Sequence, residues 1–378
     1  MSAPIQGHIL TPAGFVRGTI DVSDGRIRSL VGEPTAEARA RDEATAFVLP
    51  GFIDSHVHGG GGSDTMQGGD AIDRIARMHV RHGTTALLAT TMTAPLPDLQ
   101  FAMAAIGPVC GKRSTGAARV LGVHLEGPYI NAAKLGAQPD HVRPASVAEV
   151  LALHSLAPIS LITLAPELPG NLDIIPALRA AGFRVQIGHT LGTYDDGVAA
   201  LERGAGGFTH LFNAMSGMHH RTPGIVGAAL AHARYAEIIP DLLHVHPGAL
   251  RVALRAIPGL FCVTDSTAAA GMPDGDYQLG SHRVTKCLGG VRLADGTLAG
   301  STLTMDGAFR MLVHRAGQSV IDAAAMCATS PAAALRLDDR GAIAPGRLAD
   351  LVILDHEHRV LHTCVAGRVV YSREQATT

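Results

Sequence analysis

The feature that most constrains the fold of this 378-residue chain is a regular alternation of short apolar runs with alanine-rich, amphipathic stretches. The stretches at residues 70–83 and 146–157 carry apolar side chains at the i, i+3, i+4 spacing of a helix. The apolar runs predict strands at residues 47–53, 85–89, 120–124, 160–164, 184–187, 207–209, 236–239 and 260–263. Eight strand–helix units in about 280 residues predict an α/β fold, a (β/α)8 TIM-like barrel, whose usual length is roughly 250 residues.

An open, doubly wound sheet is the alternative architecture for such an alternation. The glycine-rich run at residues 58–62 matches neither the dinucleotide-binding pattern GxGxxG nor a phosphate-binding P-loop. The barrel is therefore the favoured interpretation.

The two ends of the chain share a different pattern, in which short strands are separated by turns. Asp24-Gly25 lies between two alternating apolar runs and predicts a β-hairpin. A similar pattern of short strands fills the last forty residues or so. We therefore expect one small β-sandwich domain built from residues 1–49 and 340–378, and a catalytic barrel domain over residues 50–339.

Composition and charge exclude several classes of protein. With 47% hydrophobic and 17% charged residues, the chain is typical of a compact enzyme and not of a disordered or fibrous protein. The formal net charge is −2, so no basic surface for nucleic acid is indicated. The sequence contains no recognisable secretory signal or membrane span, and its five scattered cysteines indicate free thiols in a reducing compartment. We expect a cytoplasmic protein with neither a nucleic-acid nor a membrane partner.

Side chains that can bind a metal follow the predicted strands where each strand ends. His56 and His58 end the first strand, and residues two apart on a strand point to the same side, so both imidazoles can face one ion. Glu126, His189 and His210 end the third, fifth and sixth strands. In a barrel these ends meet at one face, where active sites lie. Imidazole and carboxylate together suit Zn²⁺, Fe²⁺, Mn²⁺ or Co²⁺, and the sequence does not choose among them.

Asp265 ends the eighth strand beside the first, where its carboxylate could serve as a general base on metal-bound water. Each candidate also has a purely structural interpretation. A lone HxH pair means little in a chain with 20 histidines, Glu126 could pair with an arginine, and Asp265 could cap a helix. Five candidate ligands and one acid, each at a predicted strand end, together favour a catalytic metal centre.

Longer stretches around these residues run in one order along the chain. They are PGFIDSHVHGGGG at 50–62, HLEGPYIN at 124–131, GAQP at 136–139, IGHT at 187–190, THLFNAMSGMHHRTPGIVG at 209–227, LLHV at 242–245, VTDST at 263–267 and LAGSTLTMD at 298–306. In these stretches the sequence resembles the amidohydrolase superfamily and, within it, the N-acetylglucosamine-6-phosphate deacetylases.

The resemblance implies metal-dependent hydrolysis of N-acetyl-D-glucosamine 6-phosphate to D-glucosamine 6-phosphate and acetate. It implies that Glu126, His189 and His210 hold the principal ion and that Asp265 is the general base and acid. Zn²⁺ is the first expectation, with Fe²⁺, Mn²⁺ or Co²⁺ as alternatives. Family members differ at the first-strand motif, and because His56 and His58 are intact here, one or two ions per subunit can bind.

The same resemblance implies a set of substrate contacts. Those near the sugar are Ala137, Gln138, Asn213, Ala214, Leu298, Ala299 and Gly300. Arg221 and His244 would bind the phosphate, with part of this grip supplied by the neighbouring subunit of a homodimer. Two positions depart from the family pattern: Gln138 stands where many members carry histidine, and Asp241-Leu-Leu-His244-Val replaces the common DGxHV. Both departures lie at expected substrate contacts, so they bear on which sugar the protein binds.

Several alternatives stay open at this point. N-acetylgalactosamine 6-phosphate differs only at C4 and would undergo the same chemistry. A cyclic amidase of the same superfamily is more distant, because such enzymes use a carboxylated lysine in the role that Glu126 fills here. A non-enzymatic protein on an inactive barrel would have lost ligands, and all are present. Besides the metal, His124 or a backbone N–H is a candidate donor to the oxyanion.

Overall fold

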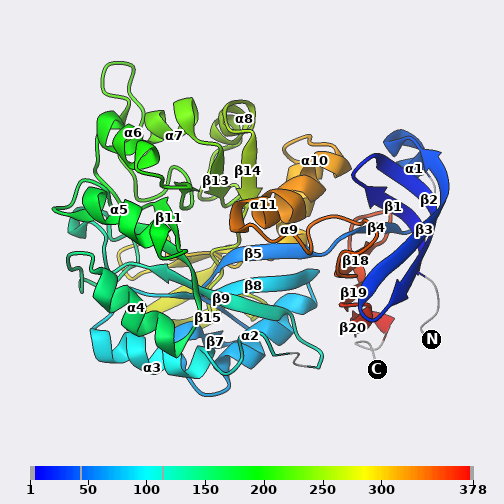
Figure 1. Ribbon diagram of the computed structural model, residues 1–378, viewed down its shortest axis with the longest axis horizontal. Coiled ribbons are helices and arrows are strands. Elements are labelled where there is room, and N and C mark those ends of the chain that lie inside the picture. Colours follow the sequence, from blue (N-terminus) through cyan, green and yellow to red (C-terminus); the bar gives the residue numbers. More distant parts are fainter. Residues whose placement is uncertain (1–4, 43–44, 113–114, 375–378) are drawn as a thin grey trace.

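The computed structural model describes residues 5–42, 45–112 and 115–374. It has two parts, a barrel of strands and helices and, beside it, a sheet to which both ends of the chain contribute (Figure 1). In the described part of the chain, no helix combines the length and the apolar character needed to cross a bilayer.

The barrel consists of parallel strands arranged in chain order. The strands are β5 (Phe52–Val57), β8 (Thr84–Thr91), β9 (Arg119–Glu126), β10 (Ile159–Leu164), β11 (Arg184–Ile187), β12 (Gly207–Phe208), β13 (Tyr235–Ile238) and β14 (Gly259–Cys262). Between β12 and β13, the Leu211 N–H donates to the Glu237 carbonyl at 2.8 Å. A bridge between Val57 and Ser266 joins the end of β5 to the segment after β14, so the cylinder closes.

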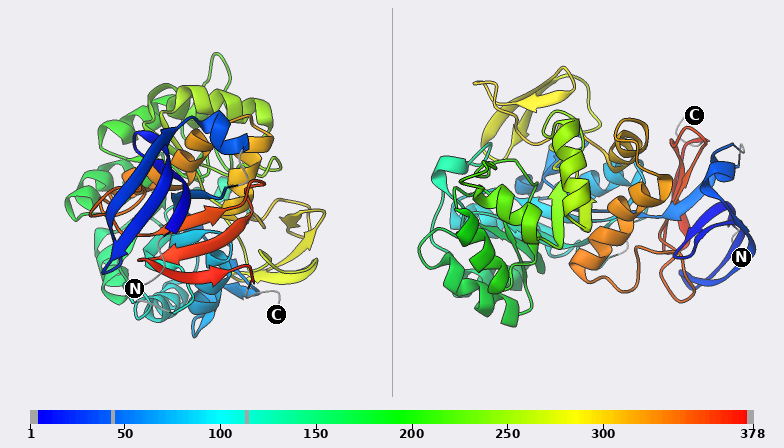
Figure 2. Two further views of the ribbon diagram at one scale, coloured as in Figure 1. Left: turned by 90° about the vertical axis from the view of Figure 1, so that its right-hand side faces the viewer. Right: turned by 90° about the horizontal axis from the view of Figure 1, so that it is seen from above.

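Helices cover the outside of the barrel between successive strands (Figures 1 and 2). They are α2 (Ala71–Val80), α3 (Leu96–Ile106), α4 (Val147–Leu156), α5 (Asn171–Ala180), α6 (Tyr194–Glu202), α7 (Gly224–His232), α8 (Pro247–Ala256) and α9 (Met305–His314). Every residue of β5 and of β8 is buried, because helices cover one face and the barrel interior the other. This is why the strands appear in the sequence as continuous apolar runs.

The chain ends form one sheet in the order β20-β19-β18-β4-β1-β2-β3. Its strands are β1 (Ile5–Thr11), β2 (Gly14–Ser23), β3 (Arg26–Thr35), β4 (Phe47–Pro50), β18 (Leu351–Leu354), β19 (Val360–Val365) and β20 (Arg368–Ser372), with α1 (Glu37–Asp42) between β3 and β4. Ile9, Ile20 and Leu351 share a core, so the sheet folds over on itself like a sandwich (Figure 2). The predicted hairpin is confirmed: Asp24 (φ 53°) and Gly25 (φ 77°) take the left-handed conformations that such a turn requires.

The prediction of one strand at residues 47–53 is wrong, because the run is divided between two sheets. β4 pairs with β1 and β18, whereas β5 opens the barrel beside β8. The chain passes from one sheet to the other at Gly51, where a Cβ atom would lie 2.3 Å from the Thr85 side chain. Only glycine fits this crossing.

The remaining elements are short and lie near the two rims of the barrel. A sheet of β15 (Gly275–Leu279), β16 (His282–Cys287) and β17 (Gly290–Arg292), which the sequence analysis did not predict, stands off the barrel (Figure 2). The others are β6 (Gly59–Gly60), β7 (Ser63–Asp64), the 3₁₀ turns η1 (Thr65–Gln67) and η2 (Ala132–Lys134), α10 (Val320–Ala324), the π-helical turn η3 (Ala325–Thr329) and α11 (Ser330–Leu335).

Candidate active site

A cavity of about 320 Å³ opens at the carboxyl ends of the barrel strands. Polar side chains from different strands meet in it, as the barrel geometry predicts. The residues that line it are His58, Met92, Glu126, Ala133, Lys134, Gly136, Ala137, Gln138, His189, His210, Asn213, Ala214, His244, Asp265, Leu279, Thr297, Leu298 and Gly300.

Glu126, His189 and His210 form the tightest cluster of the cavity. Glu126 Oε1 lies 3.1 Å from His189 Nε2 and 3.0 Å from His210 Nε2, and the two imidazole nitrogens are 3.0 Å apart. The three side chains are almost completely buried. One oxygen and two nitrogens from three strands therefore point at a single position.

The second ring nitrogen of His189 shows why this cluster suits a metal ion. Its Nδ1 lies 2.8 Å from the carbonyl of Lys134, which can only accept, so Nδ1 carries the proton. In the neutral imidazole, Nε2 then presents its lone pair to the Glu126 carboxylate. Converging lone pairs of this kind are satisfied by a cation, and the backbone carbonyl orients the ligand ring as is usual at metal sites.

A second cluster adjoins the first and shares Glu126 with it. Glu126 Oε2 lies 3.0 Å from His58 Nε2 and 3.4 Å from His56 Nε2. Asp265 Oδ1 lies 3.3 Å from His58 Nε2 and 3.5 Å from His56 Nε2. The two oxygens of Glu126 thus face different pairs of histidines, which is the arrangement of a carboxylate able to bridge two ions.

His56 is oriented by a residue that the sequence analysis missed. Glu237, fully buried on β13, lies with Oε2 3.0 Å from His56 Nδ1. The same carboxylate accepts from the Ser55 hydroxyl at 3.0 Å and from the His210 N–H at 3.3 Å. The signal for it was present in the sequence, because one acid interrupts the otherwise apolar run YAEII. A carboxylate buried there needs partners, and the neighbouring strands supply them.

The buried charges of the site hold one another ionised. Burial by itself raises the pKa of Asp265, but the charge of His56 and the hydrogen bond from His58 outweigh it and lower that pKa to about 2. Burial by itself lowers the pKa of His58, but its hydrogen bonds to Asp265 and Glu126 raise that pKa to about 9. Asp265 is therefore a carboxylate at neutral pH and can accept a proton.

Backbone geometry aims three of these side chains. His189 (φ 48°), His210 (φ 28°) and Asp265 (φ 49°) all take positive φ angles just beyond the ends of their strands. Non-glycine residues rarely adopt this conformation, and where they do it often accompanies function. Here the turn directs each side chain into the cavity instead of along the strand.

Gln138 is anchored at both ends of its amide group. Its Oε1 accepts from the Thr93 N–H at 2.7 Å, so its NH₂ group is the one that donates to Glu126 Oε2 at 2.7 Å. The position that often carries histidine in the family therefore contacts the Glu126 carboxylate in this chain.

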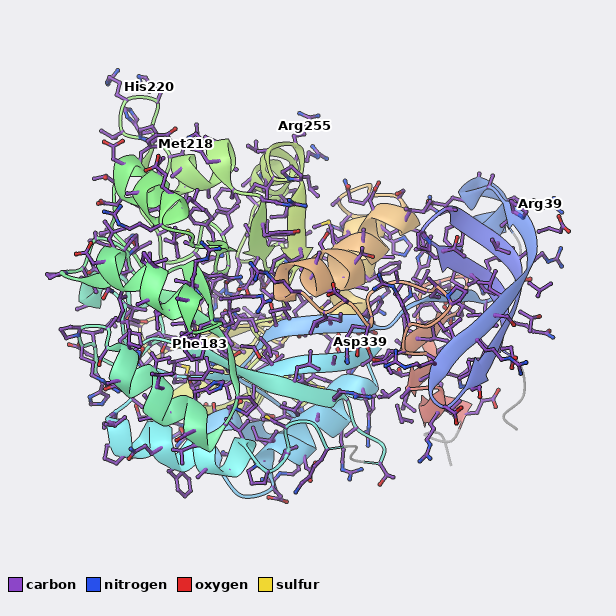
Figure 3. The ribbon with its side chains drawn as sticks, in the orientation of Figure 1. Arg39, Phe183, Met218, His220, Arg255 and Asp339 are labelled. Carbon is purple, nitrogen blue, oxygen red and sulfur yellow. The ribbon has the colours of Figure 1, made fainter. Side chains whose placement is uncertain are left out.

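Most of the residues expected to contact substrate line the cavity, but Ala299 and Arg221 do not. Those that line the cavity are Ala137, Gln138, Asn213, Ala214, His244, Leu298 and Gly300. Ala299 is fully buried and lies outside the lining. Arg221 is exposed on the loop between β12 and α7, next to His220, whose label in Figure 3 marks the outer tip of that loop.

His244 lies at the edge of the cavity, held by Asp241. Asp241 accepts from His244 Nδ1 at 2.7 Å and from the His244 N–H at 2.8 Å. Burial by itself lowers the pKa of His244, but this hydrogen bond and the charge of Asp241 outweigh it and raise the pKa above the ordinary 6.5. A partly protonated imidazole with Nδ1 engaged can donate from Nε2 to an anion.

His124 lies behind the cavity and does not line it. Its Nε2 lies 2.7 Å from the Thr163 hydroxyl, and its ring packs edge-on against His56 at 4.5 Å. Burial and then the charge of His56 lower the pKa of His124 well below its ordinary value. The structure therefore gives His124 a role in packing His56 and no direct approach to a substrate in the cavity.

The fold agrees with comparisons to known proteins. The model of the amidohydrolase family matches residues 47–370. The chain therefore belongs to the amidohydrolase family, whose members are metal-dependent.

Within this family, the chain is similar to several deacetylases of phosphorylated N-acetyl sugars. An N-acetylgalactosamine-6-phosphate deacetylase from Escherichia coli O157:H7 is 37% identical over 96% of this chain and 97% of its own. An N-acetylglucosamine-6-phosphate deacetylase from Lysinibacillus sphaericus is 37% identical over 92% of each chain. The crystal structure of an N-acetylglucosamine-6-phosphate deacetylase from Thermotoga maritima matches with a TM-score of 0.87 at 31% identity, over 98% of this chain and 99% of that one. An aspartate-to-alanine variant of the Mycobacterium smegmatis enzyme, in complex with N-acetyl-D-glucosamine 6-phosphate, matches with a TM-score of 0.88 at 33% identity, over 96% and 97%.

Proposed function

We propose that this protein hydrolyses N-acetyl-D-glucosamine 6-phosphate to D-glucosamine 6-phosphate and acetate. The observation that carries the proposal is the convergence of Glu126, His189 and His210 on one position, within a cavity that also holds the ionised Asp265. The relatives of known activity act on N-acetylhexosamine 6-phosphates, and they match nearly the full length of this chain.

The principal ion is proposed to bind Glu126, His189 and His210, and a second ion His56, His58 and the other oxygen of Glu126. Nitrogen and oxygen donors of this kind suit Zn²⁺ first, with Fe²⁺, Mn²⁺ and Co²⁺ as alternatives. When bound, such an ion lowers the pKa of a coordinated water and polarises a carbonyl oxygen.

Asp265 moves the protons of the reaction. Its carboxylate accepts a proton from the attacking water at Oδ1 as the water oxygen bonds to the acetamide carbonyl carbon. The same oxygen then delivers this proton to the amide nitrogen as the C–N bond breaks, so acetic acid and a neutral amine leave, and the acid then loses its proton to solvent as acetate. Asp265 Oδ1 lies 3.3 Å from His58 Nε2 and 3.5 Å from His56 Nε2, so this oxygen is placed beside the residues proposed to hold the ions.

The phosphate is proposed to bind His244 of one subunit and Arg221 of the partner subunit of a homodimer. A guanidinium and a protonated imidazole suit a phosphate dianion. Arg221 is exposed and does not line the cavity of its own subunit. This supports a role for Arg221 at the cavity of the partner subunit.

Deacetylation of N-acetylgalactosamine 6-phosphate is the second candidate. A full-length relative with this activity is as similar to the chain as those that act on the gluco sugar. Gln138, which departs from the family pattern, is the side chain at which we expect the two sugars to be distinguished.

Two further expectations from the sequence, the domain boundaries and the cellular location, are part of the same proposal. We propose domain boundaries at residues 1–49 and 340–378 for the terminal domain and 50–339 for the barrel. A cytoplasmic location is supported by the five cysteines, all within the described residues and all free thiols.

The direct test is acetate release by the metal-loaded protein from three substrates in parallel: the gluco phosphate, its galacto epimer and unphosphorylated N-acetylglucosamine. Preference for the gluco phosphate supports the proposal, and preference for the galacto phosphate supports the second candidate. Activity on neither phosphorylated sugar contradicts both.

A further inference from the structure

A second hollow, of about 600 Å³, lies at the other end of the barrel from the catalytic cavity. At this end Leu335 of α11 belongs to the same buried apolar cluster as the strand residues Leu88 and Leu161. The hollow lies beside α11, among the amino ends of β11 and β13 and the C-terminal ends of α5 and α6. Phe183, labelled in Figure 3, forms part of its wall.

Four arginines from separate parts of the chain line this hollow: Arg179 in α5, Arg184 in β11, Arg234 just before β13 and Arg336 just after α11. Among the residues that the structure describes, none of the four forms an ion pair. Arg184 Nε donates to the Ala334 carbonyl at 3.0 Å. The guanidiniums are therefore free of carboxylate partners in a chain whose acids outnumber its bases, 33 to 31.

Two of these charges, on Arg184 and Arg336, repel each other in the hollow. Arg184 is half-buried, and burial, together with the charge of Arg336, lowers its pKa. Glu202 is the single carboxylate of the lining and leaves a formal excess of three positive charges (four arginines minus one glutamate). An anion held between the guanidiniums would relieve this repulsion, and a concave wall strengthens its attraction.

Glycines and apolar side chains complete the hollow. Gly182 (φ 95°) and Gly204 (φ 101°) lie in its wall in left-handed conformations, and a Cβ on Gly204 would collide with the Arg179 side chain. Phe183 and Tyr235 add aromatic surface beside them. The hollow thus offers positive charge for an anionic group and apolar wall for an organic one.

We propose that this hollow binds a small organic phosphate with at least two negative charges, of the sugar bisphosphate or nucleotide class. Guanidinium groups bind phosphate oxygens in pairs, and the volume lies within the usual range of ligand sites, about 300–1,000 Å³. Because the hollow is at the amino ends of the strands, its ligand leaves the substrate cavity free. This site is independent of the proposed deacetylation.

The test uses isothermal titration of the metal-loaded protein with two probes, fructose 1,6-bisphosphate and ADP. The pocket variant combines Arg234→Gln with Arg336→Asn, since asparagine tolerates the φ of 54° at position 336. The matched control combines Arg251→Gln with Arg255→Gln, which removes the same charge from the exposed face of α8, where Figure 3 labels Arg255.

We expect one probe to bind the wild type and the control with a Kd below about 1 mM, and the pocket variant about tenfold more weakly. The probe that binds identifies the class of ligand. The proposal is overturned if neither probe binds, if both variants lose affinity equally, or if glucosamine 6-phosphate displaces the probe from the wild type. Should the double variant fail to fold, Arg179→Gln alters an exposed side chain of the same hollow and must weaken binding likewise.

Discussion

At the scale of single residues, hydrogen bonds to one atom of a histidine ring determine which other atom of the ring faces the site. Lys134 engages Nδ1 of His189, and Glu237 engages Nδ1 of His56, so both rings turn Nε2 toward Glu126. Glu126 divides its two oxygens between separate pairs of histidines. The proposed ligand set depends on partners that would not themselves contact the ion.

Asp265→Asn should lower turnover strongly and preserve metal binding. The amide keeps the size of the side chain but cannot accept the proton of the attacking water, so kcat should fall by about 10²–10⁴. Acetate release and metal analysis of the same preparation measure both effects. Near-normal kcat in this variant would remove Asp265 from its catalytic role.

Glu237→Gln should weaken binding of the second ion and spare the first. The amide no longer attracts the His56 Nδ1 proton as a carboxylate does, so the ring loses its fixed orientation, and changes of this type typically cost 10–100-fold in metal affinity. Metal titration followed by calorimetry measures the loss. Glu33→Gln on exposed β3 is the matched control. Equal affinity of the two variants for both ions would show that Glu237 does not position His56.

The KM for a phosphorylated substrate should rise with pH above the ordinary histidine value of 6.5. The folded pKa of His244 is raised, so the cationic form that grips phosphate is present at lower pH and is lost as pH passes the raised value. Initial rates across pH measure this, and His244→Gln should remove the dependence. An identical profile for that variant would assign the inflection to another group.

At the scale of elements, the chain's local signals agree with the fold where the elements are regular. The helices predicted at residues 70–83 and 146–157 are α2 and α4. α6 begins with a reciprocal cap, in which the Thr193 hydroxyl accepts from the Asp196 N–H and the Asp196 carboxylate accepts from the Thr193 N–H. By contrast, the strands β15–β17 are short, and β15 and β16 are half-exposed, so they carry no apolar run that would predict them.

Thr193→Ala should destabilise the protein by about 1 kcal/mol, the usual cost of losing an N-cap side chain. Urea unfolding, followed by circular dichroism, measures the change. Thr193→Ser keeps the hydroxyl and should stay close to the wild type. If alanine and serine are equally stable, the cap does not contribute to the stability of α6.

At the scale of the whole molecule, the proposed dimer makes the site a shared one. Arg221→Ala and Asp265→Asn subunits should each be impaired alone, the first in KM for the phosphorylated sugar and the second in kcat. In mixed dimers, one site combines Asp265 with Arg221 of the partner subunit. At substrate concentrations well below the KM of the Arg221→Ala variant, equal mixing of exchanging subunits should restore about a quarter of the wild-type activity, because half of the dimers are mixed and each has one complete site.

Two controls accompany this experiment. Unphosphorylated N-acetylglucosamine should show no effect of Arg221→Ala on KM, because no phosphate is present to be gripped. A mixture of the two variants with no more activity than the sum of its parts would place Arg221 and Asp265 in the same subunit or remove Arg221 from the site.

The residues of the candidate site that lie directly after a strand could be predicted from the sequence. Strand periodicity places Glu126, His189, His210 and Asp265 at one face of a closed barrel, and the structure brings them into one cavity. Glu237 could not be assigned in this way, because its partners lie 182 and 27 residues away, at Ser55 and His210. The same holds for the hollow at the opposite end, whose four arginines come from separate parts of the sequence.

By itself, the sequence determined the barrel, the paired chain ends and the candidate ligands at the strand ends, because backbone periodicity and turn chemistry are local properties. The tertiary structure alone decided the division of residues 47–53 between two sheets, the role of Glu126 between two histidine pairs, and the separation of Arg221 from its own cavity. These outcomes depend on packing at Gly51 and on hydrogen-bond partners from distant strands. Such contacts exist only once the chain has closed on itself.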